Sequence, residues 1–341
     1  MNKSLKDLSW QVSEEEYRKD PAYSYSTLAR FAREGFDGLP HLFDKIESPS
    51  LTFGSCVDAI ITGGNEEFDS RFMVAEMSNE PSDVQKQISE VLFRKYNETY
   101  ASLSEIPDSE MISAIEGIQW NNHWLPGTRC KKIKEDCTGY YALMFEADNK
   151  TIISTRLYNQ VMECVNALRS STATRFYFEQ DNAFDDNIQR FYQLKFKARI
   201  LGIDFRCMPD EIIVIHDKKL VVPVDLKTSS KPEWEFPKSF MQWKYYLQAN
   251  LYTRILRLVL DQDEYFKDFK IASYKFIVVN RNTLTPLVWN FSDAVINVNA
   301  QMEDPVILAV DLDRYLKEKP KVPHGISLDK PNDLDKVLNE L

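Results

Sequence analysis

Two short apolar runs near the middle of the chain place the strongest constraint on its fold. They read EIIVI (residues 211–215) and LVVPVDL (residues 220–226), and four polar residues separate them. Apolar segments joined by such a turn are typical of two antiparallel strands. Asp210 precedes the first strand and Asp225 lies near the end of the second, so a hairpin brings both carboxylates to one edge of a sheet. Because side chains alternate along a strand, Asp225 and Lys227 share a face.

These residue types suit the hydrolysis of a phosphodiester. Mg²⁺ is usually held by one or two carboxylates together with water and phosphate oxygens, and Mn²⁺ accepts the same oxygen ligands. Asp210 and Asp225 are therefore predicted to bind the metal. A lysine beside it positions the attacking water and stabilises developing negative charge, the role predicted for Lys227. Asp204 competes with Asp210 as the first carboxylate, but Pro209 and the hairpin favour Asp210 and leave Asp204 at the surface or in a supporting position.

The segment resembles the PD-(D/E)xK nuclease superfamily, with Pro209-Asp210 as the PD and Asp225-Leu226-Lys227 as the (D/E)xK. With Thr228 the motif ends in DLKT, which is similar to the RecB-like and RecE-type branch of the superfamily. That branch also carries a Gln-xxx-Tyr motif on the next helix. Gln248 and Tyr252 match that motif, and their spacing puts both on one helical face. The resemblance implies that both lie beside the active centre and help to position it and the DNA.

The resemblance extends upstream and spans roughly Tyr23 to Asn290. Residues 23–31 are similar to the Ser-rich helix start of many such nucleases, and residues 51–61 resemble the helix motif GxxxH. Gly54 matches this motif, whereas Asp58 stands where the family has histidine. Oxygen ligands suit hard cations, so Asp58 is expected as a third metal ligand. The alternative is a polar surface residue on an amphipathic helix.

Each motif alone has a plainer interpretation. A DxK at the end of a strand often lies on a solvated edge, and a Pro-Asp pair is an ordinary turn. Gln248 and Tyr252 also fit a half-buried helix face. The order of all the motifs along one chain favours the nuclease.

The cysteines argue against a disulfide framework. There are five, scattered along the chain, which suits reduced thiols. Some RecB-like nucleases hold an iron–sulfur cluster with three cysteines after the nuclease motifs; none follows Cys207, so no cluster is expected. His123, Cys130 and Cys137 match no standard zinc spacing, and ordinary core or surface residues are the default there.

Charge gives a mixed indication about nucleic acid. A net charge of −10 counts against indiscriminate binding, since phosphate contacts need local Lys and Arg. One local cluster, predicted to contact DNA or else to form a solvated face, consists of Lys195, Lys197, Arg199 and Arg206. A second basic run covers residues 129–134 and is a weaker candidate.

The expected fold class is α/β, with a central mixed sheet flanked by helices, a restriction-endonuclease-like core, and a helical N-terminal half. Residues 1–180 are expected to form the helical part packed on the core, 181–318 the nuclease core, and 319–341 a linker with a short helix. Predicted strands include one at about residues 190–200 and another at 203–208. No apolar run approaches the roughly 20 residues that cross a bilayer, and no secretory signal is evident. A cytoplasmic location, the host's if the protein is phage-encoded, is therefore expected.

The expected function is a Mg²⁺-dependent deoxyribonuclease, an exonuclease rather than an endonuclease, that resects duplex ends in phage-type recombination, replication or repair. DNA is the expected partner, with no membrane. The resemblance also implies a homo-oligomer and a single-strand annealing or replication protein as a further partner. The alternative is a nuclease-fold protein that binds DNA or serves phage assembly with little or no cleavage.

Overall fold

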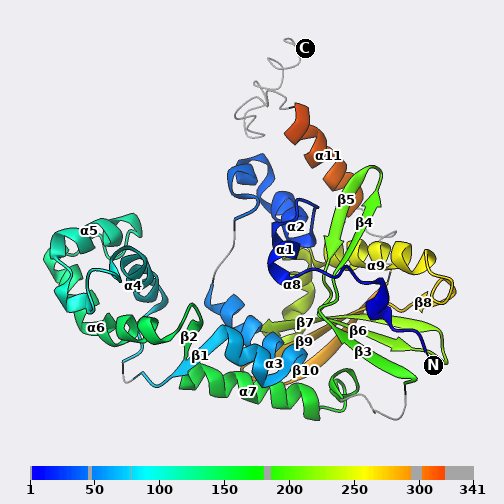
Figure 1. Ribbon diagram of the computed structural model, residues 1–341, viewed down its shortest axis with the longest axis horizontal. Helices are drawn as coiled ribbons and strands as arrows, with labels where there is room; N and C mark the ends of the chain where they lie inside the picture. The colour runs from blue at the N-terminus through cyan, green and yellow to red at the C-terminus, as the bar shows by residue number, and fades with distance from the viewer. Residues whose placement is uncertain (1, 45–47, 78, 180–185, 293–301, 319–341) are drawn as a thin grey trace.

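A mixed β-sheet lies at the centre of the computed structural model, which describes residues 2–44, 48–77, 79–179, 186–292 and 302–318 (Figure 1). Its strand order is β10-β9-β7-β6-β3, and β8 pairs with one end of β7. The pairs of β7 with β9 and β8 are parallel, and the other pairs are antiparallel. The strands are β3 (Ile188–Tyr192), β6 (Glu211–Ile215), β7 (Leu220–Ser229), β8 (Lys270–Ile271), β9 (Tyr274–Asn280) and β10 (Pro286–Phe291). The predicted α/β class with a mixed central sheet is confirmed.

The predicted hairpin forms from β6 and β7, with Ile215 opposite Leu220 and Glu211 opposite Val224. All five residues of β6 are buried, because helices cover both faces of the sheet. β7 is ten residues long and β6 only five. Residues 225–229 of β7 therefore continue past the end of β6, with β9 as their partner on the other side.

Alternate residues of the strands pack against helices on opposite faces of the sheet, which gives two separate apolar layers. α9 (Tyr245–Asp261) shares one layer with Val221 and Phe276. α3 (Pro49–Arg71) and α7 (Thr155–Ser170) share the other with Val224 and Ile277 (Figure 1). This alternation follows from the pleat of the strand and puts Asp225 and Lys227 on the α9 side.

The predicted strand at residues 190–200 is wrong as a single element. The chain instead forms β3 and then β4 (Phe196–Ile200), which pairs with β5 (Ile203–Cys207) in a separate two-stranded sheet. Gln193 lies between β3 and β4 with a φ of 51°, a left-handed conformation that breaks the extended backbone. Phe196 and Phe205 bury this hairpin against the α9 layer.

Further helices complete the α9 side. α2 (Tyr25–Glu34) begins at Ser24, whose hydroxyl accepts a hydrogen bond from the Thr27 amide. α11 (Pro305–Glu318) contributes to the same apolar layer as α2. α1 (Glu14–Lys19) and α8 (Phe236–Gln242) are shorter. No helix in the described ranges is long and apolar enough to span a membrane.

A helical unit with its own core projects from the sheet (Figure 1). It consists of α4 (Asp83–Tyr96), α5 (Asp108–Gly117) and α6 (Pro126–Glu146), and a parallel pair, β1 (Phe72–Ala75) and β2 (Thr151–Ser154), flanks it in the chain. The sequence analysis did not predict α6 or this strand pair. Cys130, Ile133 and Cys137 of α6 are buried at helical intervals, a pattern that the basic residues between them obscure.

The five cysteines are free and buried, in agreement with reduced thiols. Cys130 and Cys137 belong to the core of the projecting unit. The boundary predicted between residues 180 and 181 falls within 180–185, and the predicted C-terminal linker and helix cover 319–341. Both segments lie outside the described residues. The division into three parts therefore stays a prediction.

α3 approaches β7 closely at Gly54. A Cβ atom on Gly54 would lie 3.1 Å from Oγ1 of Thr228, closer than ordinary contact. Asp58 follows one helical turn later on the same face, so the close approach also carries Asp58 toward the end of β7.

Gly54→Val should separate α3 from β7 and reduce the free energy of unfolding by about 1–3 kcal/mol, the usual cost of overpacking. Gly139→Val on α6 is the matched control, because no neighbouring heavy atom lies within 4 Å of the added Cβ there. The control should stay within about 0.5 kcal/mol of the unmodified chain. Urea unfolding measures both; equal effects would show that the contact with Thr228 is unimportant.

Candidate active site

The free end of β7 organises the candidate active site. Because β6 stops at Glu211, the Leu226 amide has no strand partner on that side, and Oδ2 of Asp210 accepts its hydrogen at 2.7 Å. The backbone oxygen of Asp210 in turn accepts from the Gln193 amide at 3.1 Å. The Asp210 side chain thus accepts a hydrogen bond that the backbone of a longer β6 would accept, and its carboxylate lies beside β7.

Asp225 lies at the centre of this arrangement and is 1% exposed. The Gln248 side-chain amide of α9 donates to its Oδ1, and the Lys227 ammonium pairs with its Oδ2. A buried carboxylate needs such partners, since an unpaired charge in the interior is strongly unfavourable. Asp225, Lys227 and Gln248 therefore form one connected unit.

Aromatic rings support Lys227. Its Nζ lies 5.0 Å from the centre of the Tyr245 ring, a cation–π contact. Tyr245 itself packs against Phe236 and Phe276, which also contact each other. Burial by itself lowers the pKa of Lys227, but the negative charges of Asp225 and Asp210 outweigh it and hold that pKa above the ordinary value. Lys227 is therefore charged at neutral pH.

Asp58 reaches the site from α3. Its Oδ2 accepts a hydrogen bond of 2.8 Å from the Gln193 side chain, while its Oδ1 is buried without a hydrogen-bond partner. Burial raises the pKa of Asp58 to about 6; Arg71 opposes the rise and the charge of Asp225 adds to it. A buried oxygen without a donor is unfavourable unless a ligand or cation completes the site.

The carboxylates interact electrostatically. Burial raises the pKa of Asp210 well above its usual range, and the charges of Asp225 and Asp58 raise it further. In the described residues, no three Asp, Glu, His or Cys side chains are already arranged to enclose a metal ion. Mg²⁺ needs only one or two carboxylates with water, and the buried oxygens fit a hard cation that relieves their repulsion. The ligand set Asp58, Asp210 and Asp225 remains a prediction.

Tyr252 lies one helical turn after Gln248 in α9. It is buried and packs edge-on against Tyr274, with ring centres 6.3 Å apart. Burial raises its pKa well above the ordinary value. Its position suits support of the strands beneath Asp225, and its predicted part in catalysis stays a prediction.

The predicted DNA-binding cluster lies around the β4–β5 hairpin, outside the central sheet. Two members contact the N-terminal segment: Lys197 pairs with Asp20 at 2.7 Å, and Arg206 donates to the backbone oxygens of Tyr17 and Asp20. Arg199 lies across the hairpin from Asp204, 3.9 Å away, and Asp204 is exposed, as expected. Lys195 precedes β4, and its backbone oxygen accepts a hydrogen bond from the Trp10 backbone amide. DNA binding by these four residues stays a prediction.

Two residues of the site were missed by the sequence analysis. Tyr245 stands three residues before Gln248 in α9, and that helical spacing was a usable signal. Gln193 had no signal, because its contact with Asp58 joins residues 135 positions apart.

Asp58→Asn should remove a pH-dependent loss of stability. Because the pKa of Asp58 is raised from 3.8 to about 6, the folded chain binds more protons than the unfolded chain between these values. The contribution of Asp58 to the free energy of unfolding should therefore fall as pH rises from about 4 to 6 and then level off. In EDTA, Asp58→Asn should remove this part of the decline, a gain of at most about 3 kcal/mol at neutral pH, and leave the part that comes from the raised pKa of Asp210.

In the presence of Mg²⁺ or Mn²⁺, the unmodified chain should be more stable than Asp58→Asn, the reverse of their order in EDTA. A cation binds the folded site and not the unfolded chain, so it should raise the Tm of the unmodified chain more than that of Asp58→Asn. Thermal melts across this pH range, with and without metal, measure both effects. Equal metal-dependent rises would remove Asp58 from the ligand set.

The chain is similar in structure to a protein from Eubacterium rectale described as a candidate exonuclease. The match covers 90% of this chain and 86% of that chain, with a TM-score of 0.46 and 12% sequence identity. No protein-family model matches the sequence, and no curated protein is significantly similar to it. A match at this identity and TM-score carries no functional argument, so the functional assignment depends on the geometry of the site.

Proposed function

We propose that this chain is a metal-dependent deoxyribonuclease of the PD-(D/E)xK type that acts as an exonuclease on duplex ends. The observation that carries the proposal is the convergence of Asp210, Asp225, Lys227 and Gln248 at the free end of β7. These are the residues that the resemblance assigns to the active centre. The resemblance to RecE-type enzymes supports a role in phage-type recombination, replication or repair.

The proposed roles follow from charge and position. Asp210 and Asp225 would hold Mg²⁺, which supplies charge neutralisation at the phosphate and lowers the pKa of bound water. Lys227 carries a fixed positive charge beside Asp225 and would stabilise negative charge that develops on the phosphate. Gln248 holds Asp225 in place through its amide.

Degradation of DNA should require both a divalent cation and a free end. Purified protein with Mg²⁺ should degrade linear duplex and leave covalently closed circular duplex intact, and EDTA should stop the reaction. A nicked circular duplex is the control for the free end, and replacement of Mg²⁺ by Ca²⁺ is the control for the metal. Equal loss of linear and circular DNA would indicate an endonuclease, and cleavage of neither with any metal would favour the binding or assembly role.

Lys227→Ala should reduce turnover at least about 100-fold, because it removes a charge that acts mainly in the transition state. Metal and DNA binding should persist, and a fluorescence anisotropy titration of labelled duplex measures the latter. Asp204→Asn is the matched control, since this exposed carboxylate lies outside the site and its loss should leave turnover unchanged. A rate for Lys227→Ala within about twofold of the unmodified chain, some 0.4 kcal/mol of barrier, would refute the role of Lys227.

A further inference from the structure

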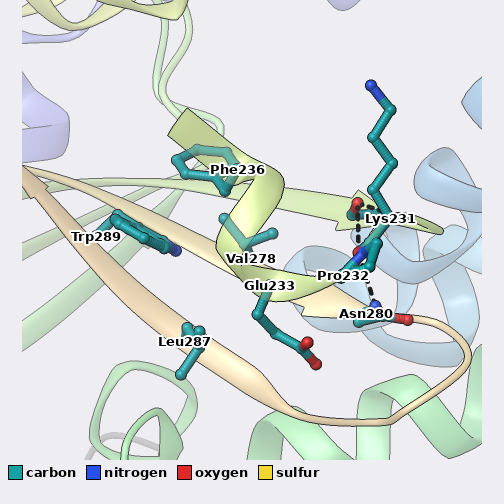
Figure 2. Close-up of a pocket in the computed structure, with 9 residues that line it drawn as sticks. Lys231, Pro232, Glu233, Phe236, Val278, Asn280, Leu287 and Trp289 are labelled. Carbon is teal, nitrogen blue, oxygen red and sulfur yellow. Dashed lines mark hydrogen bonds between the residues drawn. The ribbon is translucent and has the colours of Figure 1, made fainter. Parts of the chain in front are cut away.

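The segment that follows β7 is held rigidly against the turn between β9 and β10. The Asn280 side chain donates to the backbone oxygen of Lys231 at 2.7 Å, and that of Asn282 donates to the oxygen of Ser230 at 3.2 Å. The Thr283 hydroxyl donates to Glu233 at 2.5 Å. The hollow beside this segment has a volume of about 10 Å³. Figure 2 shows the Lys231 side chain extending away from the other residues that line it. The hollow has room for one water and is no ligand site.

A short helical stretch then presents two different faces. The 3₁₀ turn η5 (Glu233–Glu235) continues directly into α8. Phe236 and Phe240 face inward, where Phe236 packs on Trp289 with ring centres 5.4 Å apart. Residues two positions away lie on the opposite side of a helix, so Trp234 and Lys238 point outward. Trp234 is 75% exposed, and Lys238 is also exposed.

Two lysines lie on either side of Trp234 in the chain, and we define the outer α8 face as Lys231, Trp234 and Lys238. Glu233 and Glu235, the immediate neighbours of Trp234, are half-buried. Neither Lys231 nor Lys238 forms an ion pair within the described ranges of the chain, so both charges are available to a ligand.

Position and chemistry indicate one kind of ligand. Lys231 is four residues beyond Lys227, so it lies at most about 13 Å away along the strand direction. A large exposed tryptophan on a rigid backbone loses little entropy on binding and offers a flat surface for stacking. A flat aromatic surface between two cations matches an unpaired base and the phosphates of a single nucleic-acid strand.

We propose that the outer α8 face binds a single-stranded segment of DNA next to the phosphate held at the active site. Trp234 stacks on an unpaired base, and Lys231 and Lys238 contact backbone phosphates. This inference rests on the proposed function and refines it: the substrate end is unpaired where it meets the enzyme. Duplex that cannot fray would therefore be a poorer substrate than duplex with a single-stranded end.

Binding of a labelled oligothymidine of about 12 nucleotides, measured by anisotropy in EDTA, tests the proposal without any cleavage. Trp234→Ala should weaken binding about tenfold, whereas Trp234→Phe, which keeps a flat ring, should stay within about threefold. Trp124→Ala is the matched control, because Trp124 is another exposed tryptophan, 36% exposed, in the sequence between α5 and α6. The double change Lys231→Ala and Lys238→Ala should lower the salt dependence of binding by about one to two counterions.

The outcomes separate this inference from the proposed function. Unchanged affinity of Trp234→Ala, or an equal loss in Trp124→Ala, would overturn the stacking role even if the protein cleaves DNA. Weaker binding by Trp234→Ala alone would support it even if no nuclease activity were found. If Trp234→Ala left DNA binding intact but dissociated an oligomer in light scattering, the outer α8 face would be a contact between copies of the chain, and the proposal would be wrong.

Discussion

The difference in length between β6 and β7 is the constraint on which the site depends. Residues 225–229 continue past the last pair of the hairpin, so one side of β7 is open. A strand with an open side has unsatisfied amides, and the Asp210 carboxylate accepts one of them at Leu226. At this end of β7, Asp225 is buried and the Lys227 side chain is 22% exposed. The position of the Asp210 carboxylate beside β7 thus follows from the hydrogen-bonding need of the backbone.

Burial of several carboxylates in one place creates the second constraint. Asp58, Asp210 and Asp225 raise one another's free energy when charged, and the Lys227 ammonium offsets only part of this. Removing one partner of such a buried group is costly, which explains why Gln248 and Gln193 hold individual oxygens. Tyr245, which contacts the Lys227 ammonium, packs against Phe236 and Phe276.

Local patterns were sufficient for the centre of the site. The apolar runs of β6 and β7 predicted the hairpin, and the pleat predicted that Asp225 and Lys227 share a face. The four-residue spacing in α9 predicted Gln248 and Tyr252 on one helical side. Contacts between residues near in sequence follow from strand and helix geometry, so they can be read without the fold. That the exposed Asp204 lies outside the site also followed from this geometry.

Tertiary structure alone decided how the distant parts meet. The Asp58–Gln193 contact joins α3 to the break between β3 and β4, and no periodicity connects residues 135 positions apart. The left-handed Gln193 turned a predicted single strand into members of two sheets. By itself the sequence identified Asp210, Asp225, Lys227 and Gln248 as the candidate site and predicted the hairpin and the helix that hold them. The packing of α3 on β7 at Gly54 decided that Asp58 joins them, because only the close approach of two surfaces makes that contact.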